Sequence, residues 1–470
     1  MNGPGPNAHD LQDTWLDEVS APSSSSEQAS AVPVFRQVRR TASFLTTSPG
    51  KLSIITVILT LAIAAAGISM SSSSASRQEE LNELLSSTEP MSNSAHRLYT
   101  SLSAADAYAT TGFVQAGVES ETTRDAYNEA VDSAVVAATE SVLGTTPEDQ
   151  RIRDLVGLIQ RELPTYTGMV ESARSHHRAG NAVSDAYMSN ASSLMREELL
   201  PAADEIFRLT SMSVSDQQKR LTAPQWVPLS GLVAAIIFLA AAQWWLWRLT
   251  RRRFNRGFLT ATGLIGLAIV WVILSNLATW TAGSQGFSEA SRPWDMLTSS
   301  RIDAQRAYSA ETLSLVQRYS LEDLTDSFEH TQAKVTAALD EFEASDAVNE
   351  TLQTSDAADA TQKARESLDG WAYSHDRFTA ALTAGDYDEA VRQATAATPR
   401  PEERATSAGA FRGLDNALQK LIEQSRNSMR NYIQEGLSAM AMVSTAVLIL
   451  TVLAILSVWL GIRPRLQEYL

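Results

Sequence analysis

Residues 52–70 read LSIITVILTLAIAAAGISM, an apolar run without a single Asp, Glu, Lys or Arg. A membrane core about 30 Å thick requires roughly 20 such residues in a helix, because lipid offers no partner for free backbone groups. Three further runs meet the same requirement, at residues 227–247, 257–280 and 437–462. Four uncharged runs of this length are typical of a four-span membrane protein and not of a soluble core.

The first run has an alternative interpretation as a cleaved signal peptide, because small residues follow it. However, 51 residues precede it, and its apolar length exceeds the roughly 7–15 residues of a signal peptide. We therefore expect residues 52–72 to form an uncleaved transmembrane helix. We expect the protein to be a multi-pass protein of the plasma membrane.

Basic residues near the span ends predict the orientation, since Lys and Arg flanks are retained in the cytoplasm. They place residues 1–50, 248–256 and 463–470 inside, and the long segments 73–226 and 281–436 outside. The flanking basic residues are Arg36, Arg39, Arg40, Lys51, Arg248, Arg251, Arg252, Arg253, Arg256, Arg463 and Arg465.

The distribution of charge supports this orientation. The chain of 470 residues has a formal net charge of −16. Residues 73–226 hold 22 acidic and 12 basic residues, and residues 281–436 hold 26 and 15, so the rest of the chain is mildly basic. Cysteine is absent, which excludes disulfides and thiolate chemistry and leaves the outside domains to be held by packing.

Apolar residues recur at helical spacing in both outside segments, as in Tyr127, Val131, Ala134, Ala138 and Val142. The sequence therefore predicts an all-α fold: four transmembrane helices with two extracytoplasmic four-helix bundles. Breaks are expected at Gly180 and near Gly385. The expected helices cover about 75–117, 121–143, 147–179, 182–222, 285–319, 321–345, 354–399 and 404–436.

The order of span, outside domain and span occurs twice, which supports duplication of one unit. A faint repeat at an offset of 200 residues agrees with duplication, or else reflects chance matches between two alanine-rich helices. It pairs the first helix of one domain with the first helix of the other. The pairs are Leu102 with Ile302, Ala104 with Ala304, Ala107 with Ala307, and Tyr108 with Tyr308.

Signatures of catalysis are missing from the sequence. The six histidines have no metal-ligand spacing, and neither a Gly-rich phosphate loop nor a nucleophile elbow occurs. We expect no enzymatic activity, cofactor, metal or nucleic-acid partner. No charged residue lies within the spans, as a transporter would normally require for its substrate path.

Two sets of arginines are candidate binding residues. The first set lies in the short inner link and consists of Arg251, Arg252, Arg253 and Arg256. These residues fix the topology and contact lipid, or else they dock an acidic cytoplasmic protein. Arg97, Arg306 and Arg377 in the outside domains are candidates to hold a ligand carboxylate, or else are solvated surface residues.

Residues 1–50 are rich in Gly, Pro and Ser, and we expect a disordered cytoplasmic tail. Residues 10–19 are a candidate partner-docking motif or simply solvated tail. Residues 39–43 are typical of a basophilic kinase site or of a retention signal.

The architecture resembles the GlnX-type four-span membrane proteins of actinobacteria, which link a solute-binding lipoprotein to the serine/threonine kinase PknG. The segments that carry the resemblance are Ser193–Ala203, Ala408–Leu414 and Gly461–Tyr469. The resemblance implies a sensor that passes extracellular amino-acid status through a solute-binding protein to a cytoplasmic serine/threonine kinase. Its partners would be these two proteins and membrane lipid. Two alternatives remain, a structural or scaffolding envelope protein and an accessory subunit of a transporter.

Overall fold

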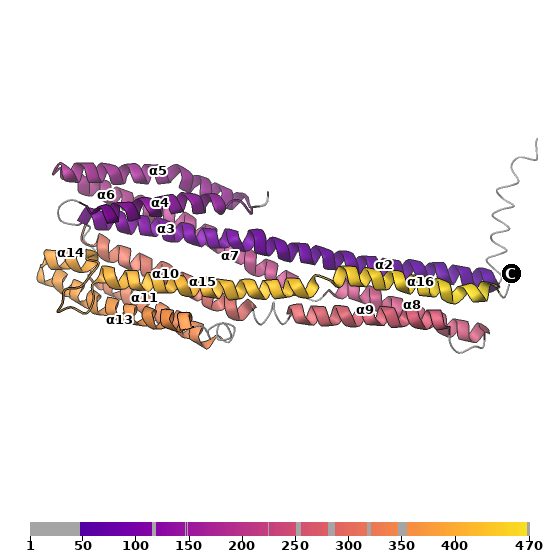
Figure 1. Ribbon diagram of the computed structural model, residues 1–470. Coiled ribbons are helices and arrows are strands. Elements are labelled where there is room, and N and C mark those ends of the chain that lie inside the picture. Colours follow the sequence, from indigo (N-terminus) through magenta and orange to yellow (C-terminus); the bar gives the residue numbers. More distant parts are fainter. Residues whose placement is uncertain are drawn as a thin grey trace, which may run out of the picture. The chain divides into compact units, whose positions relative to one another are not determined.

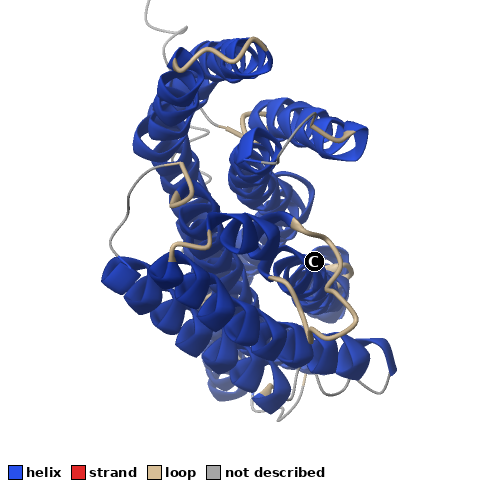
Figure 2. Cartoon of the chain, turned by 90° about the vertical axis from the view of Figure 1, so that its left-hand side faces the viewer, coloured by secondary structure: helices blue, strands red, loops and turns tan. Residues whose placement is uncertain are grey.

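The computed structural model describes residues 48–114, 119–145, 147, 149–223, 225–250, 255–280, 287–316, 321–345 and 355–467 (Figure 1). Every regular element in these ranges is a helix, and no strand occurs in them (Figure 2). The all-α prediction is therefore confirmed. The tail motifs at residues 10–19 and 39–43, and Arg251, Arg252 and Arg253, lie outside the described residues.

The helices follow the predicted ones closely, with differences at their ends. Residues 48–114 are helical throughout, and the last two helices are separated only by a turn at Ala441 and Met442. The elements are α2 (Ser48–Glu83), η1 (Leu84–Thr88), α3 (Glu89–Val114), α4 (Glu121–Glu140), α5 (Gln150–Arg178), α6 (Val183–Leu194), η2 (Met195–Leu199), α7 (Leu200–Thr222), α8 (Trp226–Thr250), α9 (Arg256–Trp280), α10 (Phe287–Leu313), α11 (Leu321–Ala344), α13 (Ser355–Ala384), α14 (Tyr387–Thr395), α15 (Ser407–Met440) and α16 (Val443–Gln467).

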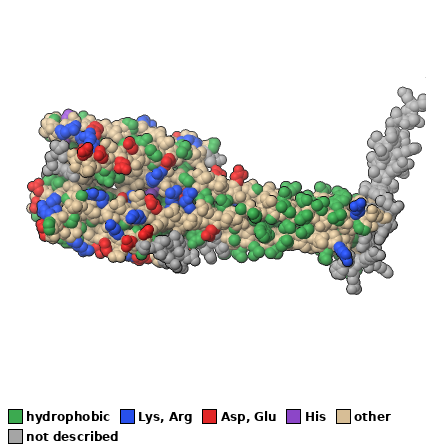
Figure 3. Space-filling view, in the orientation of Figure 1, with side chains coloured by type: hydrophobic (Ala, Val, Ile, Leu, Met, Phe, Trp, Pro, Cys, Tyr) green, Lys and Arg blue, Asp and Glu red, His purple; other side chains and the backbone are tan. Residues whose placement is uncertain are grey.

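Four helical stretches are long and apolar enough to cross a membrane, as the sequence predicts. They contain the apolar parts of α2, α8, α9 and α16. Hydrophobic side chains cover the surface of these segments, whereas Lys, Arg, Asp and Glu are spread over the other helices (Figure 3). Leu61 and Leu460, for example, are 64% and 65% exposed, which suits a surface that contacts lipid.

The described part of the chain divides into two compact units, and the smaller one contains residues 48–68, 230–250, 255–267 and 449–467. Small residues bring its helices together, because a Cβ atom added at Gly257 would lie 2.4 Å from Cα of Gly461. Asn255 donates a hydrogen bond of 2.9 Å to the carbonyl of Gly461, and Trp459 donates one of 3.2 Å to Thr60. Close backbone approach and interhelical hydrogen bonds therefore hold this unit.

The larger unit contains residues 69–229 and 268–448 and has two helical groups. The first helical group is α3 to α7, whose core includes Leu98, Leu102, Ile159, Tyr166 and Ile206. The second helical group is α10 to α15, whose core includes Val335, Leu339, Trp371, Leu414 and Leu418. Each group therefore has a hydrophobic core of its own.

The two helical groups of the larger unit pack on one another. α3 of the first group contacts α10 of the second. A third core joins residues from α2, η1, α7, α10 and α15, among them Leu81, Leu84, Val214, Ala290 and Met429. The two groups thus share buried apolar surface, which couples their stability.

Two helices that the sequence predicts as continuous contain a π turn, and each π turn ends two residues before a proline. η1 precedes Pro90, and η2 precedes Pro201. The N–H of Glu89 donates to the carbonyl of Leu84, five residues back, and the N–H of Leu200 donates to that of Met195. Proline has no N–H and its ring clashes with the preceding turn, which favours such a local widening.

The breaks predicted at the two glycines are confirmed. Gly180 has φ of +69° between α5 and α6, and Gly385 has φ of +75° between α13 and α14. Glycine adopts this left-handed conformation without the steric cost of a Cβ atom, so it ends the preceding helix. The helix predicted over about 147–179 begins slightly later in the structure, where α5 starts at Gln150.

Candidate functional site

The contact between α3 and α10 is built from the two helices that carry the sequence repeat. Ile302 of α10 belongs to the core of the first helical group, and Ala107 of α3 packs against the core of the second. Arg306 donates a hydrogen bond of 2.6 Å from Nε to the phenol oxygen of Tyr99. The repeated helices therefore face each other inside one unit.

A cavity of about 370 Å³ lies beside this contact, between the two helical groups. Its walls come from α3, the start of α4, α10, the loop after α14, and the first turns of α15. Cavities of about 300–1,000 Å³ are the usual size of small-molecule sites in proteins. The residues that shape its chemistry are Tyr108, Gln305, Tyr308, Phe411, Arg412 and Asp415.

The charged groups of the cavity are not balanced. Asp415 accepts hydrogen bonds from Arg301 at 2.7 and 2.9 Å, so its charge is neutralised within the protein. Arg412 is exposed, and no carboxylate among the described residues lies within ion-pair distance of it. The lining therefore has one uncompensated positive charge.

Gln305 provides an unused hydrogen-bond acceptor at the same place. The residue is 5% exposed and donates from Nε2 to Asp415 at 3.2 Å. Its Oε1 atom is buried and has no hydrogen-bond partner. A buried acceptor without a partner costs about 1–3 kcal/mol, so this atom favours the arrival of a donor.

Aromatic side chains form the apolar wall of the cavity. The rings of Tyr308 and Phe411 stack with centroids 4.2 Å apart and planes 8° apart, and Trp371 meets Phe411 edge-on. The hydroxyl of Tyr308 donates to the carbonyl of Ala394 at 2.9 Å. Burial raises the pKa of Tyr308 and of Tyr108, although the nearby Arg412 lowers both. Both phenols therefore stay neutral at physiological pH.

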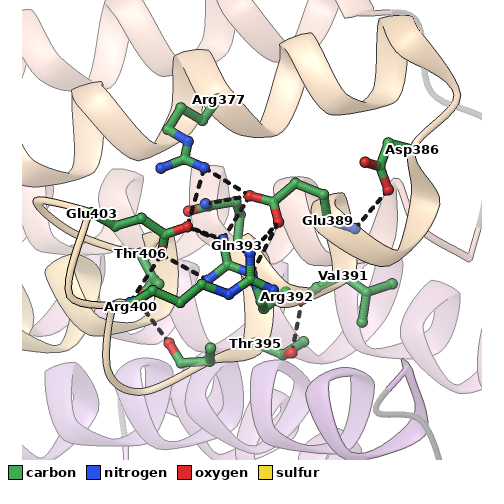
Figure 4. Close-up of polar contacts among 11 residues, drawn as sticks. Arg377, Asp386, Glu389, Val391, Arg392, Gln393, Thr395, Arg400, Glu403 and Thr406 are labelled. Carbon is green, nitrogen blue, oxygen red and sulfur yellow. Dashed lines mark hydrogen bonds and ion pairs between the residues drawn. The ribbon is translucent and has the colours of Figure 1, made fainter.

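An ion-pair network holds the chain that follows α14 (Figure 4). Arg392 binds Glu389 at 2.6 Å and also contacts Glu403, while Arg377 lies 3.0 Å from Glu389 and 3.1 Å from Glu403. Arg400 lies 3.5 Å from Glu389. Hydrogen bonds from Arg392 are the main reason that the pKa of Glu389 falls to about 2. These contacts join α13, α14 and the loop of residues 396–406.

The same loop is fixed to α15, which completes the cavity wall. Thr406 donates to the carbonyl of Ala396 at 2.7 Å and caps α15 by accepting from the N–H of Gly409 at 3.3 Å. A Cβ atom added at Gly409 would lie 2.8 Å from the carbonyl oxygen of Ala397, so this close approach requires glycine. The loop residues Ala396 and Ala397 line the cavity.

A buried carboxyl lies in the core of the first helical group. Asp106 is 2% exposed, and its Oδ1 atom accepts hydrogen bonds from Tyr166 at 3.3 Å and from Ser192 at 3.0 Å. Burial raises its pKa to about 6, partly opposed by these two donors and by Arg196. This carboxyl therefore changes its charge close to physiological pH.

A second buried carboxylate joins the two helical groups at η1. Glu89 is 2% exposed and binds both Arg426 and Arg430 of α15. Arg430 also donates to the carbonyl of Leu85 at 3.4 Å. In a regular α-helix that carbonyl would accept from Glu89, but the π turn moves this bond to Leu84, and Pro90 has no N–H to replace it. Arg430 thus satisfies the carbonyl that η1 leaves free.

The arginines proposed from the sequence as ligand contacts all pair with carboxylates of the chain. Arg97 binds Glu140, Arg306 lies 3.6 Å from both Asp204 and Asp303, and Arg377 belongs to the network around Glu389. None of the three lines the cavity described above. Arg256, the described member of the inner set, is exposed at the start of α9.

Sequence reasoning missed Arg412 and Gln305, the two cavity residues with unused binding capacity. They lie on different helices more than 100 residues apart, so no local motif joins them. The repeat at an offset of 200 residues was the available signal, because Tyr108 and Tyr308 of that repeat both line the cavity.

The fold is that of an all-α protein with four helical stretches able to cross a membrane and a packed helical unit that lines a cavity. Residues 80–219, less than a third of the chain, match the family described as an actinobacterial sensor domain. This match covers the first helical group and supports an actinobacterial sensor membrane protein. No curated protein and no solved structure matches the chain significantly.

Proposed function

We propose that the protein is a transmembrane relay that reports extracellular amino-acid status to a cytoplasmic serine/threonine kinase. The stimulus would arrive through a solute-binding protein on the outer face, and the chain itself would have no enzymatic activity. The observation that carries the proposal is the packing of the matched sensor region on the second helical group, within the unit that contains Glu89 and Arg306.

The buried contacts between the groups give this proposal a physical basis. Contact with a partner changes a population only if the partner binds one packing better than another. Here α3 meets α10 and α15 through Tyr99, Arg306, Glu89 and Arg430, so a shift in one group alters buried polar contacts of the other. Helix shifts of about 1–2 Å are a common form of such a switch.

The inner basic link would then recruit the kinase through Arg251, Arg252, Arg253 and Arg256. Charge complementarity mainly gives specificity and fast association with an acidic surface. Lipid contact and retention of topology remain further roles of the same residues.

Co-purification from native actinobacterial membranes tests the proposal. We expect the tagged full-length protein to retain a kinase and a solute-binding lipoprotein. Replacement of Arg251, Arg252 and Arg253 by Gln, with Arg248 and Arg256 kept to hold the topology, should remove the kinase alone. The matched control replaces Arg463 and Arg465 by Gln and should keep both partners. An eluate that contains a transport ATPase instead, or neither partner, would contradict the relay.

A further inference from the structure

The cavity between the two helical groups has features that contact with a partner protein does not explain. Five chain segments line it, and it holds an unpaired Arg412 and a buried acceptor, Gln305 Oε1, that has no partner. We propose that it binds a small organic carboxylate that also carries an N–H or O–H donor.

The positive charge defines the first part of the ligand. The negative charge of Asp415 is already paired with Arg301, so Arg412 is the charged residue of the lining that has no ionic partner. A guanidinium binds a carboxylate through two parallel hydrogen bonds, which are stronger than neutral ones. Arg412 lies close enough to Tyr108 and Tyr308 to lower the pKa of both phenols, which places its charge beside the cavity wall.

The orphan acceptor defines the second part. Oε1 of Gln305 accepts only from a donor, and Nε2 of the same side chain is fixed by its bond to Asp415. That bond also assigns the amide orientation, since Asp415 accepts from Arg301 and leaves Gln305 to donate. An amino or hydroxyl group of the ligand would satisfy the free oxygen.

The remaining walls define its body. Phe411 and Tyr308 offer a stacked aromatic surface, while Ala104 and Ala107 of α3 leave room because their side chains are small. The cavity of about 370 Å³ suits a molecule the size of an amino or hydroxy acid with a modest apolar side chain.

This inference goes beyond the proposed relay, because it gives the protein a ligand of its own at a site between the groups. A bound carboxylate would touch α10 and α15 at once and would favour the packing in which both helices face the cavity. Binding is measured on the purified full-length protein without partners. Its failure would therefore leave the co-purification result untouched.

Titration calorimetry on the full-length protein in nanodiscs tests the inference with a panel of α-amino and α-hydroxy acids. We expect saturable binding of at least one acid. Its carboxamide, which lacks the negative charge, and its analogue without the amino or hydroxyl group should each bind more weakly. A panel without any saturable ligand would overturn the proposal.

Variants then assign the contacts. Arg412→Gln should weaken binding of the acid about tenfold or more, the worth of one charge-assisted contact. Lys420→Gln removes a positive charge from an exposed, unpaired position eight residues further along α15 and should leave affinity unchanged. Gln305→Met should weaken the acid but not its analogue without the donor. Equal affinities of the wild type and Arg412→Gln would also overturn the proposal, provided that both melt at similar temperatures.

Discussion

The phenol oxygen of Tyr99 in α3 lies 2.6 Å from Nε of Arg306 in α10 and accepts its hydrogen bond. Tyr99 is buried, and burial raises its pKa to about 12. Arg306 is half exposed and also lies 3.6 Å from Asp204 of α7. One arginine of the second helical group thus contacts two helices of the first.

The Tyr99–Arg306 contact should be measurable as a coupling energy. Tyr99→Phe and Arg306→Met each remove the hydrogen bond, so their effects on stability should fall short of additivity by about 0.5–1.5 kcal/mol. Unfolding of the two single variants and the double variant in detergent gives this value. Arg365→Met serves as the control partner, because Arg365 pairs with Asp340 and Glu343 inside the second group. Full additivity in the Tyr99 cycle would show that the contact contributes nothing.

Asp106 should make stability depend on pH between about 4 and 6. Its pKa is about 6 in the folded protein against an ordinary value of 3.8, so the folded state holds the proton more tightly. This contribution is complete below the unfolded pKa and is lost as the pH rises through about 6. Asp106→Asn keeps an oxygen acceptor for Tyr166 and Ser192 and avoids the buried charge.

We therefore expect the free energy of unfolding of Asp106→Asn at neutral pH to exceed that of the wild type by up to about 3 kcal/mol. The difference should vanish below about pH 4. Thermal unfolding across this range measures it, with Asp125→Asn at an exposed position of α4 as the control for a lost negative charge. His96, whose pKa burial lowers to about 3, acts in the opposite sense but is common to both proteins. A difference that is constant with pH would refute the role given to Asp106.

Glu89→Gln should destabilise the larger unit. It leaves Arg426 and Arg430 without their shared carboxylate, and both arginines are about three-quarters buried. Removal of one partner from a buried pair costs about 3–5 kcal/mol, and the partial exposure of the arginines reduces this to about 2–3 kcal/mol. Denaturant unfolding measures the loss. Glu83→Gln, at an exposed position one turn and a half earlier, should have little effect; equal losses in the two variants would count against the bridge.

Glu403→Gln should loosen the loop that lines the cavity. The side chain of Glu403 is nearly inaccessible and accepts from Arg392 and from the backbone N–H of Arg400 at 3.1 Å. Without the charge of Glu403, Glu389 is the carboxylate that remains to pair with Arg377, Arg392 and Arg400. Amide hydrogen exchange should then become faster in residues 396–406 than in the neighbouring α13. Glu402→Gln, exposed and unpaired beside it, is the matched control and should leave the exchange pattern as in the wild type.

The absence of native cysteine permits a direct test of orientation. Single substitutions Gln150→Cys and Lys334→Cys place a thiol on each helical group, and Arg256→Cys places one at the inner link. An impermeant maleimide applied to intact cells should label the first two and spare the third. The reverse pattern would remove the proposed direction of signalling.

Much of the fold follows from the sequence because its signals are local. The apolar runs, the helical spacing of Tyr127 to Val142, and the turns at Gly180 and Gly385 each depend on a short stretch of chain. The sequence did not predict the π turns, because a proline is not a sufficient signal for one. Pro164, for example, lies within α5, and α5 contains no π turn. Proline alone therefore does not decide whether a helix widens.

The candidate site was beyond prediction because it depends on pairing between distant helices. The sequence alone does not distinguish the roles of Arg97, Arg306, Arg377 and Arg412. The structure separates them, since the first three meet carboxylates and the fourth does not. Likewise, the charge of Asp415 is neutralised by Arg301 from another helix. Such pairing is a property of the packed unit and not of any segment.

The π turn η1 has a consequence for protein engineering. It closes its hydrogen bond over five residues where an α-helix uses four, so it acts as a one-residue insertion in a helix of about 100° per residue. If Leu84–Thr88 formed a regular α-helix of the same length, α3 would rotate by about that angle against residues 69–83, whereas deletion of one of these residues together with the π turn would keep the phase. A chimaera that fuses α3 to a foreign anchor must therefore preserve this phase, or Tyr99 will face the wrong neighbour.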